Sequence, residues 1–327
     1  MSLISKARIT ALGAYVPPKK LTNFDLEKQV DTSNEWIIQR TGIMERRITE
    51  KNVYASDLAQ KAVKDLEQNY KKSLANLDLI VVATITPDFL TPSVAAVVQG
   101  ALGLKNTVGV LDINAACAGF VYGLYIANAF ITAGQNEKVL VISAEVLSKI
   151  TDYTDRNTCI LFGDGAAAML VERDEENPGF FSCFYGADGT LATKLYCTNL
   201  SPHFKGTKLE KQRFLWQDGR AVYSYIIKTI PRGMKELLKR AGMSKDDLNW
   251  FVPHSANMRM IQSICEKMHF PMQKTLTSLE QLGNTSSTSI PLAIWLAEKQ
   301  GKLKKGDKLA LYGFGGGLNH AGIIIEW

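Results

Sequence analysis

Cys117 is the residue of this sequence that is best placed for nucleophilic chemistry. It lies near the start of an uncharged segment that runs from Ile113 to Gly134. If this segment is a helix, Cys117 stands at its N-terminus, where the helix dipole and unpaired N–H groups favour the thiolate, the reactive form of cysteine. The flanking alanines also suit a small buried core cysteine, and the residue type alone does not decide between the two.

Two polar residues in the second half of the chain fit the same chemistry. His254 follows the apolar segment W-F-V-P at 250–253 and is predicted at the end of a strand. A histidine there is either a core residue whose hydrogen bonds are satisfied within the protein or a catalytic base. Asn284 precedes a second apolar segment and is most simply a helix N-cap. Neither residue identifies a function by itself.

Two glycine-rich segments raise the question of a nucleotide cofactor. The segment G-F-G-G-G-L-N at 313–319 allows a tight turn or a close approach to a ligand, but it lacks the G-x-G-x-x-G spacing of a dinucleotide-binding loop. The segment G-D-G-A-A-A at 163–168 comes closer, yet M-L-V-E follows it and indicates a strand where that motif needs a helix. We therefore exclude a nicotinamide site.

A short helix is predicted near the N-terminus, because T-S-N-E at 32–35 is typical of a capping box. The helix would place Trp36 and Arg40, four residues apart, on one face. An indole beside a guanidinium suits an adenine ring and a phosphate group. A packed tryptophan with an exposed arginine is the alternative interpretation.

Both halves of the chain repeat one pattern of elements that would position these residues. Short apolar segments at 79–84 and 250–255 predict strands, each between two helical segments. A further strand follows at 108–113 in the first half and at 275–279 in the second, and each precedes an apolar helix. Strands at 139–143 and 309–313 complete the two patterns.

The spacing within the two patterns is the same. Cys117 precedes Gly134 by 17 residues, and Asn284 precedes Gly301 by 17 residues. The repeat predicts a duplicated α/β layered structure in which both apolar helices are buried between sheets. Cys117 and Asn284 would then stand at matching helix starts.

The uncharged segment is long enough to span a bilayer, but the repeat argues against a membrane helix. Its counterpart in the second half carries Ser286, Glu298 and Lys299, so that segment does not span lipid. We expect a buried core helix in both halves. The N-terminal M-S-L-I-S-K-A-R lacks the apolar segment of a secretory signal, and we expect a cytoplasmic protein.

The composition bounds the remaining classes of function. The chain has 327 residues, 46% hydrophobic and 21% charged, as in a globular protein of one large or two medium domains. The five cysteines form no C-x-x-C pair, so neither a zinc site nor a disulfide framework is suggested. A net charge of +6 is too small for a dedicated nucleic-acid binder, but it is compatible with acidic or phosphorylated partners.

Taken together, the motifs resemble the β-ketoacyl-acyl carrier protein synthase III family, the initiating condensing enzymes of bacterial fatty acid synthesis in the thiolase superfamily. The similarity covers nearly the whole chain and keeps the order of the motifs. The matching motifs are D-T-S-N-E-W-I-I-Q-R-T-G-I (31–43), A-A-C-A-G-F (115–120), T-D-R (154–156), F-G-D-G-A (162–166), V-P-H-S-A-N-M-R (252–259), G-N-T-S (283–286) and F-G-G-G (314–317).

The resemblance implies a fold and a catalytic triad. The fold would be a thiolase-like α/β structure with the layers α-β-α-β-α, built from two duplicated halves at residues 1–172 and 173–327. Cys117 would be the nucleophile, with His254 and Asn284 completing the catalytic site. The backbone N–H groups of Cys117 and Gly316 would form the oxyanion hole for acyl transfer.

The resemblance also implies a coenzyme A site. Trp36 and Arg156 correspond to residues that sandwich the adenine, and Arg40 corresponds to a phosphate contact. We expect Asn257 to contribute to the same site.

The acyl pocket and the carrier-protein contact are expected from the same resemblance. Arg259 corresponds to a contact with the carrier protein, and Phe314 and Thr91 are expected to border the acyl pocket. Thr91 stands where some relatives have a phenylalanine, and Gln217 stands where many have a methionine. The preferred primer therefore does not follow from the sequence.

The function implied is decarboxylative condensation. An acyl group from acyl-coenzyme A would be loaded on Cys117 and condensed with malonyl-acyl carrier protein, giving β-ketoacyl-acyl carrier protein, CO₂ and coenzyme A. We expect a homodimer that forms through the central sheets, with no metal or cofactor, no nucleic acid and no membrane partner.

Three other functions were considered. A related synthase could load starter units for a polyketide or quinolone-like product. A non-catalytic acyl-carrier-binding homologue would have no need for Cys117, His254 and Asn284 together. A thioesterase would leave the malonyl-decarboxylating pair of His254 and Asn284 without a role.

Overall fold

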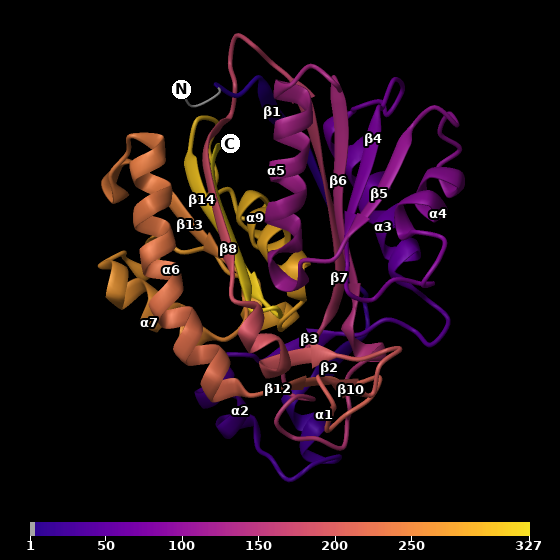
Figure 1. The fold of residues 1–327 in the computed structure, drawn as a ribbon, viewed down its shortest axis with the longest axis vertical. Coiled ribbons are helices and arrows are strands. Elements are labelled where there is room, and N and C mark those ends of the chain that lie inside the picture. Colours follow the sequence, from indigo (N-terminus) through magenta and orange to yellow (C-terminus); the bar gives the residue numbers. More distant parts are fainter. Residues whose placement is uncertain (1–3) are drawn as a thin grey trace.

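Two β-sheets form the framework of the computed structural model, which describes residues 4–327 (Figure 1). The first sheet has the order β1-β7-β6-β4-β5, in which β4 pairs in parallel with β5 and β6, and β7 is antiparallel to β1 and β6. Its strands are β1 (Ala7–Tyr15), β4 (Leu79–Ala83), β5 (Gly109–Ile113), β6 (Lys138–Val146) and β7 (Asp164–Arg173).

The second sheet has the order β13-β14-β15-β8. Its one parallel pair is β13 with β14, and the other two pairs are antiparallel. The strands are β8 (Phe180–Ala187), β13 (Trp250–Pro253), β14 (Lys308–Gly315) and β15 (Asn319–Glu326).

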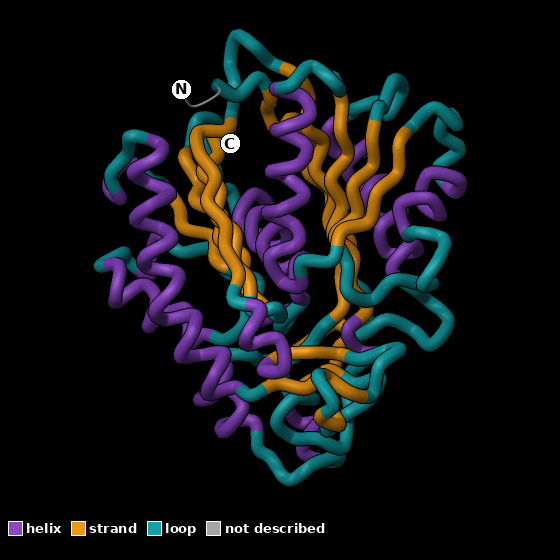
Figure 2. Tube along the Cα trace, viewed as in Figure 1, coloured by secondary structure: helices purple, strands orange, loops and turns teal. Residues whose placement is uncertain are grey.

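Helices lie outside each sheet and between the two sheets, which gives the α-β-α-β-α layers (Figures 1 and 2). In Figure 2 the purple helices separate and flank the two groups of orange strands. The helices of the first outer layer are α3 (Ala55–Tyr70) and α4 (Val94–Ala101), those of the central layer are α5 (Gly119–Thr132) and α9 (Ser289–Lys299), and those of the second outer layer are α6 (Gly219–Ala241) and α7 (Met258–Met268). The layered thiolase-like fold is thus confirmed.

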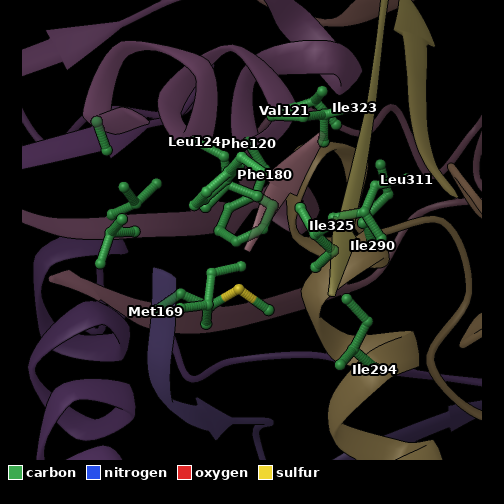
Figure 3. Packing of buried hydrophobic residues seen from close by; sticks show 14 of the residues in the cluster. Phe120, Val121, Leu124, Met169, Phe180, Ile290, Ile294, Leu311, Ile323 and Ile325 are labelled. Carbon is green, nitrogen blue, oxygen red and sulfur yellow. The ribbon is translucent and has the colours of Figure 1, made fainter. Parts of the chain in front are cut away.

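The central layer explains why the segment after Cys117 carries no charge. Helix α5 contacts strands of both sheets, so apolar residues are needed on more than one of its faces. Phe120 and Leu124 are fully buried there, against Ile290 and Ile294 of α9 and against side chains of both sheets (Figure 3). The expected core helix is confirmed, and within residues 4–327 no helix is long and apolar enough to cross a membrane.

Smaller elements close one end of the molecule, at the bottom of Figure 1. They are α1 (Asn23–Glu27), α2 (Asn34–Thr41), α8 (Leu279–Leu282), β2 (Lys20–Thr22), β3 (Glu45–Arg47), β9 (Leu195–Cys197), β10 (His203–Phe204), β11 (Thr207–Lys208) and β12 (Leu215–Gln217). Short 3₁₀ turns link the elements: η1 (Ala116–Ala118), η2 (Leu147–Lys149), η3 (Gly189–Lys194), η4 (Lys245–Asp247), η5 (Met272–Lys274) and η6 (Ser286–Thr288).

One predicted strand is wrong. The segment 275–279 makes a single bridge, Phe251 to Thr275, and then enters α8. It does not continue as a strand, because the Ser278 backbone N–H donates to the Ser255 hydroxyl and its own hydroxyl donates to the Ser289 carbonyl. The second sheet therefore has four strands where the first has five.

The other repeated elements lie where the pattern predicted them. The strand predicted at M-L-V-E is part of β7, which already begins at Asp164 and so includes most of G-D-G-A-A-A. The division into domains at residues 172 and 173 stays a prediction, since α5 and α9 share one core with both sheets. Near the N-terminus, α2 is confirmed, but its cap differs from the prediction. Ser33 is the cap and accepts from the Trp36 N–H at 3.1 Å, so no acidic side chain stands at the third helical position to close a capping box.

Candidate active site

Cys117 lies in the 3₁₀ turn η1, immediately before α5. The preceding residue, Ala116, has φ of 46°, in the left-handed region that costs a non-glycine residue about 1–3 kcal/mol. Strain of this kind persists where the surrounding structure imposes it. The turn presents the Cys117 sulfur to a cavity, where the Ser286 hydroxyl donates to it at 3.4 Å.

The matching turn in the second half is η6, and its register corrects one prediction. Ser286 has φ of 51°, as Ala116 has in η1, and α9 begins directly after η6 as α5 begins after η1. The structural counterpart of Cys117 is therefore Ser287 and not Asn284. The equal 17-residue spacing was misleading, because α9 has 11 residues and α5 has 14.

Asn284 lies two residues before η6, and the structure bears on both interpretations of it, the cap and the catalytic residue. Its Oδ1 accepts from the Ser286 N–H at 2.9 Å, as expected for a residue that caps the turn. Its backbone is fixed on both sides, because its N–H donates to the Leu161 carbonyl and its carbonyl accepts from the Gly163 N–H. Asn284 lines the cavity, and the bond at Oδ1 leaves its Nδ2 group free to donate there.

His254 follows β13 directly, as predicted, and is buried beside α9. Its Nδ1 lies 2.7 Å from the Ser289 hydroxyl, which also accepts from the Ser255 N–H at 3.1 Å. Among residues 4–327 the buried Ser289 hydroxyl has no acceptor other than this Nδ1. Ser289 therefore donates to Nδ1, and the imidazole proton lies on Nε2.

The pKa of each side chain shows which can change its charge. Burial lowers the pKa of His254 to about 3, against a smaller raising effect of its hydrogen bond to the Ser286 backbone, so the imidazole is neutral at pH 7. Burial raises the pKa of the Cys117 thiol to about 12, whereas the Ser286 hydrogen bond lowers it. Burial and the helix start thus act on the thiol in opposite directions, and the expectation that the helix start favours the thiolate stays a prediction.

The glycine-rich segment lies directly against the Cys117 turn. A Cβ at Gly315 would lie 2.9 Å from the Cys117 backbone nitrogen, and one at Gly313 would lie 2.6 Å from the Ala118 Cα. Any side chain at these positions would displace the turn, so the glycines are required for close approach. Gly316 follows and lines the cavity beside Cys117.

The cavity has a volume of about 1730 Å³, well above the about 300–1,000 Å³ of a typical small-molecule pocket. Such a volume suits a long ligand. Most residues singled out from the sequence line it: Cys117, His254, Asn284, Gly316, Phe314, Trp36, Arg40, Asn257 and Arg259. The ring of Phe314 meets that of His254 edge to face at 5.2 Å.

At the outer part of the cavity, two guanidinium groups approach Trp36. The Cζ atoms of Arg40 and Arg156 lie 5.6 and 5.4 Å from the centre of its indole ring. Arg156 is exposed and also donates to Asp31, and its side chain does not line the cavity. Asn257 caps α7 and donates to the Arg40 carbonyl at 3.0 Å. These contacts bring the predicted coenzyme A residues together.

Arg259 is an exposed cationic residue that lines the cavity. It lies in the first turn of α7, and its Nε donates to the Gln39 carbonyl of α2 at 2.8 Å. The remaining donors of its guanidinium stay available at the mouth of the cavity.

Thr91 does not take the predicted place in the acyl pocket. It is exposed and does not line the cavity, whereas the preceding residues Phe89 and Leu90 do. The start of this loop is fixed by Asp88, which accepts from the Ser56 N–H and hydroxyl, and the chain then turns so that Thr91 stays outside. Gln217 does line the cavity.

The sequence reasoning missed three polar residues behind the site: Glu145, Ser286 and Ser289. A weak signal was present for each. Glu145 is a charged residue at the end of an apolar strand, and the two serines belong to a hydroxyl-rich start of an otherwise apolar helix. Within the described range 4–327, no group of three or more His, Cys, Asp or Glu side chains is arranged to hold a metal ion.

Family models and curated relatives agree on one family. A model described as 3-oxoacyl-[acyl-carrier-protein] synthase III matches residues 111–189, and its C-terminal counterpart matches residues 238–327. The chain is 56% identical over 324 residues to β-ketoacyl-[acyl-carrier-protein] synthase III 2 of Halalkalibacterium halodurans, covering 99% of this chain and 97% of the relative. It is 55% identical over 324 residues to the protein of the same name from Bacillus subtilis, covering 99% of each.

Solved structures show the same likeness. The β-ketoacyl-[acyl carrier protein] synthase III of Thermus thermophilus superposes with a TM-score of 0.94 at 42% identity, covering 98% of this chain and 99% of that one. The priming β-ketosynthase of the R1128 polyketide biosynthetic pathway superposes with a TM-score of 0.90 at 31% identity, covering 98% and 96%.

Proposed function

The chain belongs to the 3-oxoacyl-[acyl-carrier-protein] synthase III family, and from this we propose that it is the condensing acyltransferase that starts fatty acid synthesis. The observation that carries the proposal is the convergence of Cys117, His254 and Asn284 in one cavity. The first supplies a nucleophile and the other two supply neutral hydrogen-bond donors. This combination serves acyl transfer followed by decarboxylation.

In the first half-reaction, the Cys117 sulfur attacks the carbonyl carbon of an acyl-coenzyme A. The carbonyl oxygen becomes an oxyanion, for which the backbone N–H groups of Cys117 and Gly316 are the proposed donors. When the intermediate collapses, the bond to the coenzyme A sulfur breaks and the acyl group stays on Cys117. One thioester replaces another, so the acyl group is stored without a large change in free energy.

In the second half-reaction, malonyl-acyl carrier protein loses CO₂ and leaves an enolate. The Nε2–H of His254 and the Nδ2 group of Asn284 are the proposed donors to its oxygen. The neutral state of His254 fits this role, because the imidazole keeps its Nε2 proton without having to take another one. The carbanion then attacks the acyl carbon and displaces the Cys117 sulfur, which gives β-ketoacyl-acyl carrier protein.

The outer part of the cavity is the proposed coenzyme A site. Trp36 and Arg156 would hold the adenine between them, Arg40 would contact a phosphate, and Asn257 would fix the position of Arg40 through its carbonyl. Arg259 at the mouth is the proposed contact for the acidic carrier protein. Phe314 is the proposed wall of the acyl pocket.

We also propose that the protein is a homodimer formed through the first sheet. Strand β5 ends the order of that sheet, and its Val110 and Leu111 are exposed. An apolar edge strand is a template for pairing with a second strand, and a second copy would cover it. Phe89 and Leu90, also exposed, lie in the loop that follows the neighbouring strand β4. The cytoplasmic location stays a prediction.

The proposal is tested by incubating the protein with a panel of acyl-coenzyme A primers and malonyl-acyl carrier protein. The mass of the intact protein should rise by one acyl unit, and peptide analysis should place that unit on the peptide that contains Cys117. β-Ketoacyl-acyl carrier protein should also form. A protein that takes up no acyl group from any primer in the panel would contradict the proposal.

A second function, the loading of starter units for a polyketide, is supported by the likeness to the R1128 priming synthase. The same panel separates the two functions. Condensation of the resulting acyl chain by the fatty acid machinery supports the first, and turnover only with a polyketide carrier protein supports the second.

A further inference from the structure

Glu145, at the end of β6, is a buried carboxyl group that neither half-reaction uses. Its side chain is fully buried, and no cation lies within ion-pair distance of it among the described residues. A lone buried charge costs several kcal/mol unless hydrogen bonds compensate for it. Four donors do so: Thr84 Oγ1 at 3.3 Å, the Ile85 N–H at 3.1 Å, Thr86 Oγ1 at 2.9 Å and Ser287 Oγ at 3.1 Å.

The hydrogen bonds identify the charged form as the resting one. Thr84 Oγ1 accepts from the Thr86 N–H, and Thr86 Oγ1 accepts from the Val146 N–H, so both hydroxyls have their protons available for Glu145. Burial nevertheless raises the pKa of Glu145 to about 7, against the hydrogen bonds from Ile85 and Thr86 that lower it. A carboxylate in this position exchanges a proton readily near neutral pH.

Turn η6 connects this carboxylate to the nucleophile. Ser287 donates to Glu145 Oε1, and the adjacent Ser286 lies on the Cys117 sulfur at 3.4 Å. Ser286 is also among the hydroxyl groups whose hydrogen bonding lowers the pKa of Glu145. Burial is the largest cause that raises the pKa of the Cys117 thiol, and the charge of Glu145 is a second, smaller one. The thiol therefore responds to the charge of Glu145.

The neighbours of Glu145 leave few other places for a proton. The segment after β4 faces it with the hydroxyls of Thr84 and Thr86, and η6 faces it with the hydroxyls of Ser286 and Ser287. Cys117, from η1, is a titratable side chain whose pKa is raised by the charge of Glu145.

His254 is a poor acceptor for the Cys117 proton. Its Nε2 carries a proton, and its Nδ1 accepts from Ser289. Burial also opposes a charged imidazole. The thiol must nevertheless lose its proton when the sulfur attacks, since the thiolate is the nucleophile.

We propose that Glu145 receives the Cys117 proton through the Ser286 hydroxyl during acyl transfer. As the sulfur forms its bond to the acyl carbon, the thiol proton passes to Ser286 Oγ, and the hydroxyl proton of Ser286 passes to Glu145. The hydroxyl turns from the sulfur to the carboxylate for this step. When the coenzyme A sulfur leaves with the electron pair of its bond, the proton returns to it by the same route, so Glu145 is again a carboxylate and the site has neither gained nor lost a proton.

This inference rests on the proposed function, and its test is an alkylation that needs no substrate. The rate at which iodoacetamide alkylates Cys117 is measured between pH 5.5 and 9.5, by mass analysis of the peptide that contains Cys117. The wild-type rate should show an inflection near pH 7, because burial raises the pKa of Glu145 to about 7. Glu145→Gln keeps the shape of the side chain but accepts no proton, so the inflection should be absent and the rate at pH 7.5 should fall about 10²-fold.

A second variant addresses the route itself. Ser286→Gly removes the hydroxyl and suits the positive φ at this position, so the turn should persist. Its pH profile should match that of Glu145→Gln. Thr288→Val is the control, because it removes a hydroxyl of the same turn that bonds Ser143 and contacts neither Cys117 nor Glu145. It should keep the wild-type profile.

Two outcomes would overturn the inference. The first is a wild-type profile in Ser286→Gly or in Glu145→Gln. The second is faster alkylation of Glu145→Gln at every pH, which would mean that the carboxylate only keeps the thiol neutral. Failure of the proposed function looks different, since the wild type would then form no acyl-enzyme from acyl-coenzyme A. Release of CO₂ from malonyl-acyl carrier protein should persist in Glu145→Gln.

Discussion

The turns that precede α5 and α9 have nearly the same backbone and very different surroundings. Ala116 and Ser286 have φ of 46° and 51°, and the residues before them, Ala115 and Thr285, have ψ of 34° and 30°. The N–H of the third residue in each turn bonds back to the carbonyl three residues earlier, at 3.1 Å in both halves. Duplication thus preserved a strained turn at the start of the central helix.

The side chains on the two turns have separate tasks. In η1 the neighbours of Cys117 are alanines, and its sulfur faces the cavity. In η6 the equivalent residue, Ser287, is fully buried and bonds Ser143 at 2.6 Å and Glu145 at 3.1 Å. The comparison teaches that one backbone device holds a nucleophile in one half and anchors a polar network in the other.

The largest effect is expected for the nucleophile itself. Cys117→Ala should lower the rate of acyl-enzyme formation by more than about 10⁴-fold, as is typical when a nucleophile is removed. The measurement is intact-protein mass after incubation with acyl-coenzyme A. Cys183→Ala, on β8, is the matched control and should acylate normally. An adduct on Cys117→Ala at the usual rate would show that the nucleophile lies elsewhere.

Asn284→Ala should separate the two half-reactions. The variant removes a donor to charge that develops during decarboxylation, so CO₂ release from malonyl-acyl carrier protein should slow about 10²–10³-fold. Acyl transfer should slow less, since its donors are backbone groups. Both rates are followed separately in the same preparation. Equal slowing of both half-reactions would mean that Asn284 acts mainly as the cap of η6, through the hydrogen bond that its Oδ1 accepts from the Ser286 N–H.

For protein stability the order of the two equivalent positions should be reversed: a substitution at Ser287 should cost more than one at Cys117. Ser287→Ala removes one hydrogen-bond partner from Ser143 and one from Glu145, so the free energy of unfolding should fall by about 1–3 kcal/mol. Cys117→Ala should change it by less than about 1 kcal/mol, because only one weak hydrogen bond is lost. Denaturant titration checks both. A larger stability loss in Cys117→Ala would break the comparison drawn between the turns.

The smallest expected effect is a pH slope that arises beside the second turn. There Ser289, the structural counterpart of Gly119, forms a hydrogen bond with His254. Burial lowers the pKa of His254 from 6.5 to about 3. Between these two pH values the unfolded chain binds a proton that the folded protein does not bind. The contribution of His254 to stability is therefore fully present above pH 6.5 and is lost as pH falls towards 3, with a slope of up to about 1.4 kcal/mol per pH unit.

The measurement is the free energy of unfolding of the wild type and of His254→Gln at several pH values from 5 to 7. The difference between the two proteins should shrink as pH falls. His203→Gln, on the exposed strand β10, is the control and should follow the wild type. A difference that stays constant over this range would contradict the assignment of a neutral, buried His254.

Much of the site could be predicted because local pattern and motif order are properties of the sequence. The uncharged segment 113–134 indicated a helix buried on several faces, and W-F-V-P indicated the strand that ends at His254. The likeness of the motifs to one family then brought Cys117, His254 and Asn284 into a single hypothesis. The structure places all three on one cavity.

The spacing of residues along the chain did not show which residue of the second half matches Cys117. Equal distances to a glycine suggested that Asn284 matches Cys117, whereas the backbone angles match Ser287 with it. A helix that loses three residues keeps its apolar pattern, so periodicity does not show the loss. The position of Thr91 was likewise decided by a loop, whose course depends on the contact of Asp88 with Ser56.

By itself, the sequence determined the order of elements, the apolar central helices and the residue types at their starts, because these depend on neighbours along the chain. Only the tertiary structure decided the protonation of the site. The tautomer of His254 depends on Ser289, and the pKa values of Cys117 and Glu145 depend on burial and on contacts made by η6. Removal from water and hydrogen bonds between distant segments exist only once the two halves have packed together.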